Sequence, residues 1–242
     1  MAGAPTLFWS PGTCARVSLV ALEEIGEPYE AVIVDRRGGK TALDDQHPHI
    51  SQTAYLEINP KGKVPSLQVG STVVTENPAI QTYLTRRYPS VRLLPQGSLE
   101  LETEVLATIS WFAAGVHPNI TRFRFPRMFT DDGSAQSAIR ARARTLLEEA
   151  FALIERRLNE REWLFGDWSL PDVYLLWLWF RATGSGMAAD PFPNCAAHAL
   201  RCEARPSVAT VLTLEENAYQ WLDHAGRIPK DFPPYAAGRA PR

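Results

Sequence analysis

The first eighty-odd residues alternate between short apolar stretches and helical periodicity. Thr6 to Trp9 is apolar and predicts a strand. Apolar residues at helical spacing predict a helix over Ala15 to Glu24, with Gly26 as its C-terminal stop. Tyr29 to Val34 predicts a second strand. Because these elements follow one another closely, we expect a parallel pair of strands with a right-handed crossover.

The next stretch, Asp35 to Ala54, shows little periodicity and contains two adjacent glycines with several Asp and His residues. It predicts an irregular, mobile segment with room for one short helix. His47, His49 and the pair Asp44-Asp45 lie close together in it. Their spacing is not that of ligands on one rigid helix, so we expect no metal site.

A hairpin and a helix complete the first half of the chain. Val64 to Val69 and Thr72 to Thr75 predict two strands joined by the two-residue turn Gly70-Ser71. Asn77-Pro78 then opens a helix, since proline suits the first turn. The order strand–helix–strand followed by strand–strand–helix is the thioredoxin-like arrangement. We therefore predict an α/β thioredoxin-like domain over residues 1–90.

After a connector rich in Pro and Gly, the pattern becomes wholly helical. We predict a second, all-α domain over residues 97–242. Ser169 and Asp172 have the spacing of a capping box, with Asp in place of the usual Glu or Gln. The expected helices span Leu99 to Val116, Ala135 to Leu158, Pro171 to Arg181 and Val208 to Leu222.

Charge and cysteine content narrow the classes of function. The 25 Lys and Arg nearly cancel the 27 Asp and Glu, giving a net charge of -2, so broad attraction to nucleic acid or to an anionic membrane is not expected. The N-terminus has no secretory pattern, and the longest apolar run, Val173 to Phe180, is too short for a membrane span. Three cysteines, an odd number, favour a reducing, cytoplasmic setting.

The first candidate for chemistry is Cys14, at the junction of the first strand and helix. Backbone N–H groups and the helix dipole there favour an anion, and Arg16 is near in sequence, so a thiolate would be stabilised. Ser10 and Thr13 offer hydroxyl groups that could instead hydrogen-bond a bound thiolate. Cys14 could equally be a small buried apolar residue under the helix end.

Two further candidates lie before and after the hairpin. A cis peptide is expected at Val64-Pro65, where the backbone could pair with an extended peptide, and Lys61 and Lys63 could neutralise a carboxylate. A charged surface turn is the alternative. Glu76 could pair with a ligand ammonium group while N–H groups of the next helix accept a carboxylate, although an Asn cap beside an acid is also ordinary helix chemistry.

The order and spacing of these motifs resemble the cytosolic glutathione transferase family across nearly the whole chain. The first motif, Ser10-Pro-Gly-Thr-Cys14, is most similar to the bacterial beta class, although Ala15 stands where that class usually has Ser. The segment Ile109 to Phe129 also resembles the beta-type first helix of the second domain. The other motifs are Asn59-Pro-Lys-Gly-Lys-Val-Pro65, Thr75-Glu-Asn-Pro-Ala-Ile80 and Gly166-Asp-Trp-Ser-Leu-Pro-Asp-Val-Tyr-Leu175.

The resemblance implies glutathione as cosubstrate and assigns its parts to residues of this chain. Cys14, or alternatively Ser10, would activate the thiol, and His117 would lie near the sulfur. A packed or capping histidine is the alternative for His117. The remaining assignments are Val64 with cis-Pro65 for the cysteinyl moiety, Glu76 and Asn77 for the γ-glutamyl end, and Lys63 and Lys40 for the glycyl carboxylate.

The implied activity is a transferase that lowers the pKa of the glutathione thiol and directs it at a small apolar electrophile or a disulfide. Cys14 suggests that mixed-disulfide or reductive chemistry competes with conjugation. Glutathione-dependent reduction, ether cleavage or dehalogenation on the same fold, or a non-catalytic interaction protein, are the alternatives. The family resemblance further implies a homodimer. Aromatic residues of the second domain would wall the apolar pocket or fill the core, namely Trp111, Phe112, Phe123 and Phe125.

Overall fold

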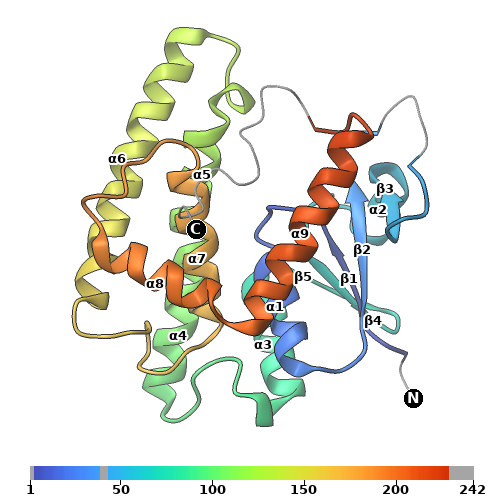
Figure 1. Ribbon diagram of the computed structural model, residues 1–242, viewed down its shortest axis with the longest axis horizontal. Helices are drawn as coiled ribbons and strands as arrows, with labels where there is room; N and C mark the ends of the chain where they lie inside the picture. The colour runs from blue at the N-terminus through green and yellow to red at the C-terminus, as the bar shows by residue number, and fades with distance from the viewer. Residues whose placement is uncertain (1–2, 39–42, 229–242) are drawn as a thin grey trace. The chain divides into compact units, whose positions relative to one another are not determined.

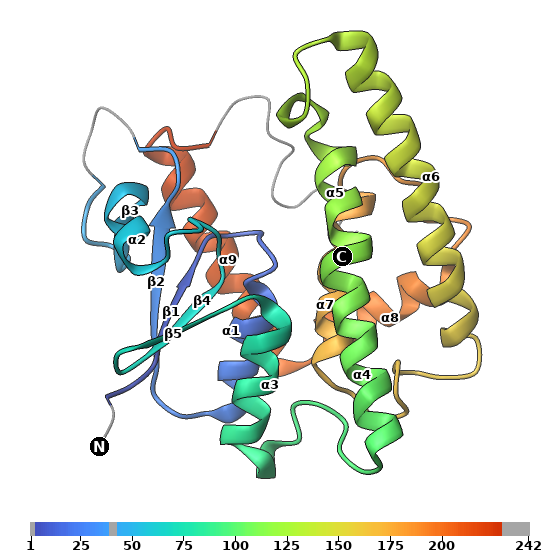
Figure 2. The same ribbon diagram turned by 180° about the vertical axis from the view of Figure 1, so that it is seen from behind.

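The computed structural model describes residues 3–38 and 43–228, which its contacts group into two compact units. Within the described residues, unit 1 comprises the chain up to Leu93 together with 206–228, and unit 2 comprises Leu94–Arg205. Figures 1 and 2 label the elements of both units from opposite sides. No helix in the described part of the chain is long and apolar enough to cross a bilayer.

Unit 1 contains a mixed sheet with the strand order β3-β2-β1-β4-β5. β1 pairs in parallel with β2 and antiparallel with β4, so Leu7 lies opposite both Ala31 and Leu67. β3 pairs in parallel with β2, and β5 closes the hairpin with β4. The strands are β1 (Thr6–Trp9), β2 (Glu30–Asp35), β3 (His49–Ser51), β4 (Ser66–Val69) and β5 (Thr72–Thr75).

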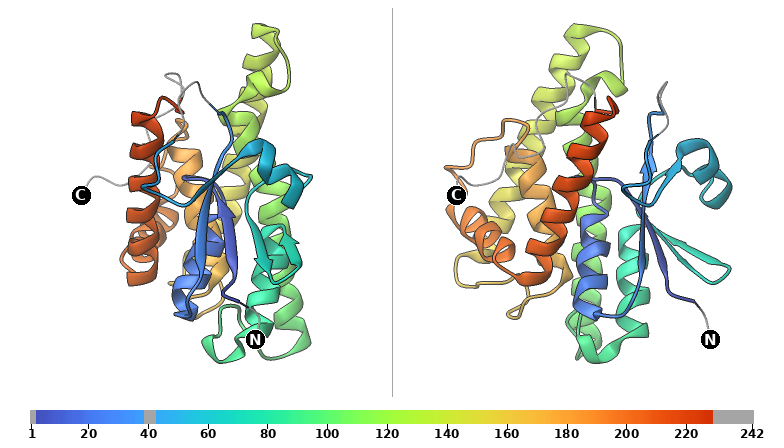
Figure 3. Two further views of the ribbon diagram at one scale, coloured as in Figure 1. Left: turned by 90° about the vertical axis from the view of Figure 1, so that its right-hand side faces the viewer. Right: turned by 45° about the vertical axis from the view of Figure 1, so that its right-hand side comes forward.

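Helices cover both faces of this sheet (Figure 3). α1 and α3 pack together on one face, and α9 packs on α1. On the other face, Tyr55 of α2 packs with Phe8 and Val34 in an apolar cluster. The helices of unit 1 are α1 (Arg16–Ile25), α2 (Gln52–Ile58), α3 (Asn77–Arg87), the short η1 (Pro89–Val91) and α9 (Pro206–His224).

Unit 2 is helical, with α7 at its centre. α7 is buried along nearly its whole length, which matches its almost uninterrupted apolar sequence. It packs against α4, α5 and α8, and α6 packs against α5 and α8. The elements are α4 (Leu99–Trp111), η2 (Phe112–Val116), α5 (His117–Arg124), η3 (Pro126–Met128), α6 (Gly133–Leu158), α7 (Leu170–Thr183) and α8 (Pro193–Glu203).

The sequence predicts most of these elements, with three differences. The segment expected to be irregular contains strand β3, which extends the sheet beyond β2. Helix α8 is absent from the prediction. The helix expected over Leu99 to Val116 instead continues to Arg124 through a π-helical turn, η2. Pro118 lacks the N–H that an α-helix needs at this point, and a widened turn is one way to accommodate it.

The compact units also differ from the expected domain boundaries. The helical pattern predicts one helical domain over the whole of 97–242, but the contacts of α9 group it with unit 1. The physical reason is its packing on α1 and a buried ion pair between Arg16 and Glu215, whose side chains are 1% and 0% exposed. The last helix therefore completes the core of the first unit.

Candidate functional site

Cys14 lies where β1 gives way to α1, in a turn fixed by its own hydrogen bonds. The backbone N–H and the hydroxyl of Thr13 both donate to the carbonyl of Ser10, at 3.3 and 2.7 Å. This turn places Cys14 directly before Ala15, the N-cap residue of α1. The positive end of the helix dipole is therefore beside the thiol, which favours a negatively charged sulfur at this position.

The Val64-Pro65 peptide is cis, as the sequence predicts. The Sγ of Cys14 lies 3.9 Å from the carbonyl oxygen of Val64, so the first two predicted motifs meet. The turn is held from the other side by Lys63, whose carbonyl accepts hydrogen bonds from Tyr55 Oη at 2.7 Å and Asn59 Nδ2 at 2.8 Å. The backbone at this position is thus fixed next to the sulfur.

Asn77 links the third motif to the first. Its buried side chain accepts a hydrogen bond from the hydroxyl of Ser18 at 3.0 Å and donates one to the carbonyl of Cys14 at 2.8 Å. The amide therefore joins the start of α3 to the cysteine turn. Because this side chain is already bound inside the protein, we assign any ligand contact of Asn77 to its backbone N–H.

Glu76 has an unusual backbone conformation, with φ 73° and ψ 129°. A positive φ costs a non-glycine residue about 1–3 kcal/mol, and such residues cluster at functional sites. Its carboxylate is exposed and lies 3.3 Å from Nζ of Lys61, which also donates to Thr75 Oγ1 at 2.9 Å. An acidic group is thus held at the start of α3, on the surface, with its nearest cation on an equally exposed side chain.

The side chains of Ser10 and Arg16, which the sequence predicts beside a thiolate, bind other groups in the structure. The hydroxyl of Ser10 donates to the carbonyl of Val34 at 3.0 Å, so its proton stabilises the end of β2. Nε and Nη2 of Arg16 donate to one carboxylate oxygen of Glu215, at 3.0 and 2.7 Å. Both groups were expected to act on a thiolate, and in the structure both hold the fold around Cys14.

The structure gives less support to the two lysines that are predicted to bind the glycyl carboxylate, Lys63 and Lys40. The side chain of Lys63 is exposed, and its backbone supports the cis turn. Lys40 lies outside the described residues. The structure therefore brings together Cys14, Val64 and Asn77 through direct contacts, with Glu76 adjacent in the chain.

His117 belongs to unit 2, at the start of α5. Its ring packs edge-on against Trp177, with centroids 4.4 Å apart, and its Nδ1 lies 3.4 Å from the hydroxyl of Tyr174. Burial, and then the positive charge of Arg181, lower the pKa of His117 from 6.5 to about 4. The imidazole is therefore neutral at pH 7.

The aromatic residues near His117 divide between core and surface. Phe112 and Phe123 are fully buried, so they fill the core of unit 2. Trp111 is 36% exposed, and Phe125 is half-buried. These last two are the aromatic side chains of the group that could still face a ligand.

Arginine side chains gather beside Phe123. Arg140 donates to the carbonyl groups of Phe123 and Ser185, and its guanidinium lies 4.3 Å from the Phe123 ring centroid. Arg144 lies over the same ring at 5.4 Å. Burial, and then the charge of Arg144, lower the pKa of Arg140. Arg140 and Arg144 contact carbonyl groups and an aromatic ring, which concentrates positive charge here.

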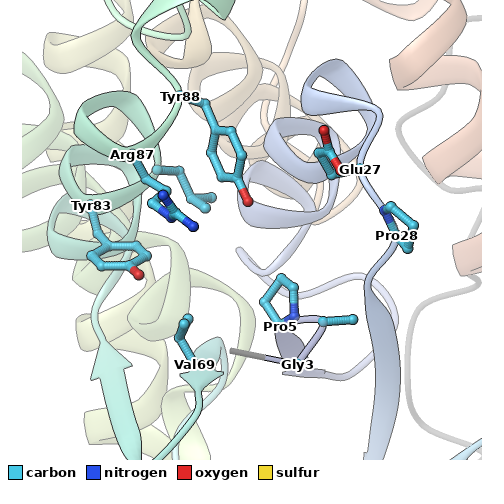
Figure 4. A pocket seen from close by; sticks show the side chains of 10 residues that line it. Gly3, Pro5, Glu27, Pro28, Val69, Tyr83, Arg87 and Tyr88 are labelled. Carbon is cyan, nitrogen blue, oxygen red and sulfur yellow. The ribbon is translucent and has the colours of Figure 1, made fainter. Parts of the chain in front are cut away.

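A cavity of about 300 Å³ lies elsewhere in unit 1 (Figure 4). It is lined by Tyr83, Arg87 and Tyr88 at the end of α3, and by residues before β1 and after α1. Cys14 follows the opposite end of β1, so this cavity is separate from the candidate site. Within the described residues, no group of three or more His, Cys, Asp or Glu side chains could hold a metal ion.

Sequence reasoning missed the contributions of α9. Glu215, Trp221 and Arg227 contact Arg16, Asp44 and Asp35, which are 199, 177 and 192 residues away in the chain. No local motif marks Glu215, Trp221 or Arg227 in its own stretch of sequence. Only an independent prediction that α9 packs on unit 1 could have identified them.

Comparisons with known proteins all find similarity to glutathione S-transferases and their relatives. Residues 11–87 match the family model described as glutathione S-transferase, N-terminal domain. A maleylacetoacetate isomerase of Pseudomonas aeruginosa is 30% identical over 64% of this chain and 77% of its own. A bacterial beta class glutathione S-transferase of Sphingomonas chungbukensis is 30% identical, with a TM-score of 0.70 over 87% of this chain and 98% of its own. A sphingomonad glutathione S-transferase complexed with glutathione is 29% identical, with a TM-score of 0.70 over the same shares.

Proposed function

The chain belongs to the glutathione S-transferase family, and we propose that Cys14 is the residue through which it handles the glutathione thiol. It is a glutathione transferase, with glutathione as its cosubstrate. The observation that carries the role of Cys14 is its position: the sulfur lies at the N-terminus of α1 and 3.9 Å from the Val64 carbonyl. Ser10 is less suited, because its proton is bound to Val34.

Glutathione would bind in an extended form along the cis turn. The backbone of Val64, next to Pro65, would pair with the cysteinyl moiety as an added strand does. The carboxylate of Glu76 would bind the γ-glutamyl ammonium, and the backbone N–H of Asn77 its carboxylate. Lys63 and Lys40 would neutralise the glycyl carboxylate. This orientation brings the glutathione sulfur toward Cys14.

The chemical step needs a thiolate. A thiol with a pKa of about 8.5 is only a few per cent ionised at neutral pH, so N–H groups at the start of α1 would raise the reactive fraction. The glutathione thiolate then forms a bond to the electrophilic atom as the leaving group departs. With a disulfide, Cys14 attacks one sulfur and releases the other as a thiolate, and glutathione resolves the mixed disulfide. His117, neutral at pH 7, would act near the sulfur as a hydrogen-bond partner rather than as a cation.

Calorimetry of glutathione binding tests the site. We expect Glu76→Ala to weaken binding at least tenfold (about 1.4 kcal/mol), because it removes the partner of the ammonium group. Glu27→Ala, an exposed acid at the opposite end of the unit 1 sheet, is the matched control and should bind as the wild type does. Equal affinity in all three proteins would remove Glu76 from the site.

Thiol labelling tests the role of Cys14. Burial raises the pKa of both Cys195 and Cys202, so neither thiol should react in the folded protein. We expect iodoacetamide to modify one cysteine, Cys14, and glutathione to slow the reaction. Thiol-transfer activity should be lost in Cys14→Ala and kept in Ser10→Ala. The reverse pattern of activities would assign the thiol chemistry to Ser10.

A second candidate function is glutathione-dependent isomerisation of a carboxylated substrate. The arginine cluster of Arg140 and Arg144 in unit 2 favours it, because guanidinium groups bind carboxylates well. One relative is a maleylacetoacetate isomerase. An isomerase regenerates glutathione and a conjugating enzyme consumes it. Loss of free glutathione in step with substrate would therefore favour conjugation, and turnover without such loss would favour isomerisation.

We also propose the second substrate, the cellular role and the oligomeric state that the family resemblance implies. The second substrate of the transferase would be a small apolar electrophile, and the role a detoxifying one in the cytoplasm. Two copies of the chain would form a homodimer. Light scattering on the purified protein would measure the mass of the assembly, and a panel of neutral and carboxylated electrophiles would separate the two substrate classes.

A further inference from the structure

Helix α9 and the turn after it contact the rest of unit 1 at successive points along their length. Ser207 at its start hydrogen-bonds Glu24 of α1, and Glu215 in its middle pairs with Arg16. Trp221, near its end, contacts Asp44 in the segment between β2 and α2, and Arg227, after the helix, pairs with Asp35 at the end of β2. Figure 1 shows α9 crossing α1 and ending beside β2.

Trp221 holds the segment through three side chains. Its indole Nε1 donates to Oδ1 of Asp44 at 2.7 Å, and the rings of His47 and His49 pack against it at centroid distances of 5.1 and 5.4 Å. Trp221 itself is 6% exposed, whereas Asp44 is exposed. The hydrogen bond from Trp221 is the largest cause of the lowered pKa of Asp44, so the carboxylate is ionised and held by the indole.

Arg227 holds the beginning of the same segment. Its Nε donates to Oδ2 of Asp35, the last residue of β2, at 2.9 Å, with both side chains nearly buried. The other carboxylate oxygen of Asp35 accepts the backbone N–H groups of Arg37 and Gly38. One buried carboxylate therefore connects the turn after α9 to the point where the chain leaves the sheet.

The two described stretches that these contacts hold, residues 35–38 and 43–49, lead to the candidate glutathione site. At one end, Val34 accepts the hydroxyl of Ser10, four residues before Cys14. At the other, Gln52 of α2 donates to the carbonyl of Gly62, two residues before Val64. A displacement of these stretches would therefore move groups that border Cys14 and the cis turn.

We propose that Trp221 and Arg227 are positioning residues that hold residues 35–38 and 43–49 against α9 and the turn after it, and thereby set the affinity for glutathione. The inference rests on the proposed function of the site and adds residues that no local motif marks. Trp221 binds Asp44 and Arg227 binds Asp35. Loss of Trp221 or Arg227 raises the KM for glutathione, because groups that border the site shift. The rate of the chemistry at Cys14 is unchanged once glutathione is bound.

Steady-state kinetics with varied glutathione and a saturating electrophile test the inference. We expect Trp221→Ala and Asp44→Ala to raise the KM for glutathione about tenfold with kcat within about twofold of the wild type. Asp44→Asn keeps a carbonyl acceptor for the indole and should restore most of the affinity. His224→Ala, an exposed residue of the same helix, is the control and should leave both parameters unchanged.

Limited trypsin digestion supplies a readout that does not depend on activity. Cleavage after Arg36 and Arg37, both exposed, should be faster in Asp44→Ala and Trp221→Ala than in the wild type. Since Asp44 is exposed, its alanine variant should fold even if Trp221→Ala does not. If the wild type binds glutathione and Asp44→Ala has the same KM and the same digestion rate, the inference is overturned and the proposed function stands. If calorimetry detects no glutathione binding by the wild type, both are overturned.

Discussion

At the scale of single residues, His117 is a half-buried imidazole whose environment opposes its positive form. It lies against Trp177 and Tyr174, and burial with the nearby Arg181 lowers its pKa from 6.5 to about 4. In the unfolded chain the same group titrates near 6.5. Between these values the unfolded state binds more protons than the folded state, so stability falls as pH falls.

We therefore expect His117→Asn to lose less stability than the wild type between pH 7 and about 4.5. The wild type should lose up to about 3 kcal/mol from this group, since each pKa unit corresponds to about 1.4 kcal/mol. Urea unfolding at the two pH values measures the difference. Equal losses in both proteins would mean that His117 titrates normally in the folded state.

The candidate site could be predicted where its signals are local. Cys14, the cis peptide at Pro65, and Glu76 lie in short motifs whose residue types carry the chemistry themselves. The partner of Arg16 could not be predicted in this way. An arginine next to a cysteine suggests stabilisation of a thiolate, but the guanidinium pairs with Glu215, 199 residues away. Such long-range pairing leaves no trace in the neighbouring sequence.

At the scale of elements, the start of α7 is held by the carboxylate of Asp172. It accepts the backbone N–H groups of Leu164 and Ser169, both at 2.9 Å, and contacts Nε2 of His198 on α8 at 2.9 Å. Asp172 and His198 are fully buried. One side chain thus fixes the loop before α7, the first turn of α7 and the packing of α8.

We expect Asp172→Ala to destabilise the protein by at least about 3 kcal/mol, because it removes a cap and leaves a buried histidine without its partner. Asp132→Ala is the matched control. Asp132 caps α6 on the surface through Ser134 and Ala135, so its loss should cost only about 1 kcal/mol. Urea denaturation, or soluble yield if Asp172→Ala does not fold, measures the contrast. Similar losses in the two variants would contradict the proposed anchoring role.

The sequence reveals only half of this arrangement. The spacing of Ser169 and Asp172 predicts the helix start, and the structure confirms that Asp172 accepts the N–H of Ser169. The contact with His198 is missed because α8 is not predicted. The sequence likewise does not predict β3, since three residues, His49–Ser51, are too few to show alternation. They form a strand because the edge of β2 offers them hydrogen-bonding partners.

At the scale of the whole molecule, the order of elements along the chain does not give the composition of the compact units. A change from mixed to helical pattern near residue 97 suggests a single boundary. The contacts instead return α9 to unit 1, where it covers α1 and pairs with Arg16. A helical pattern predicts α9 correctly but does not specify which core receives its apolar face.

This arrangement predicts that residues 1–93 do not form a stable fold by themselves. Without α9, the outer face of α1 would be exposed, and Arg16 would lose the carboxylate of Glu215. Removal of one partner from a buried ion pair typically costs 3–5 kcal/mol, which is a large part of the stability of a small domain. Joining 1–93 to 206–242 through a flexible linker of about 15 residues should restore a cooperative thermal transition by circular dichroism. The same joined chain with Glu215→Ala should not show a cooperative transition, because α9 would then lack the carboxylate that pairs with Arg16. A cooperative transition in 1–93 alone would mean that unit 1 is complete before α9 and that the ion pair is dispensable.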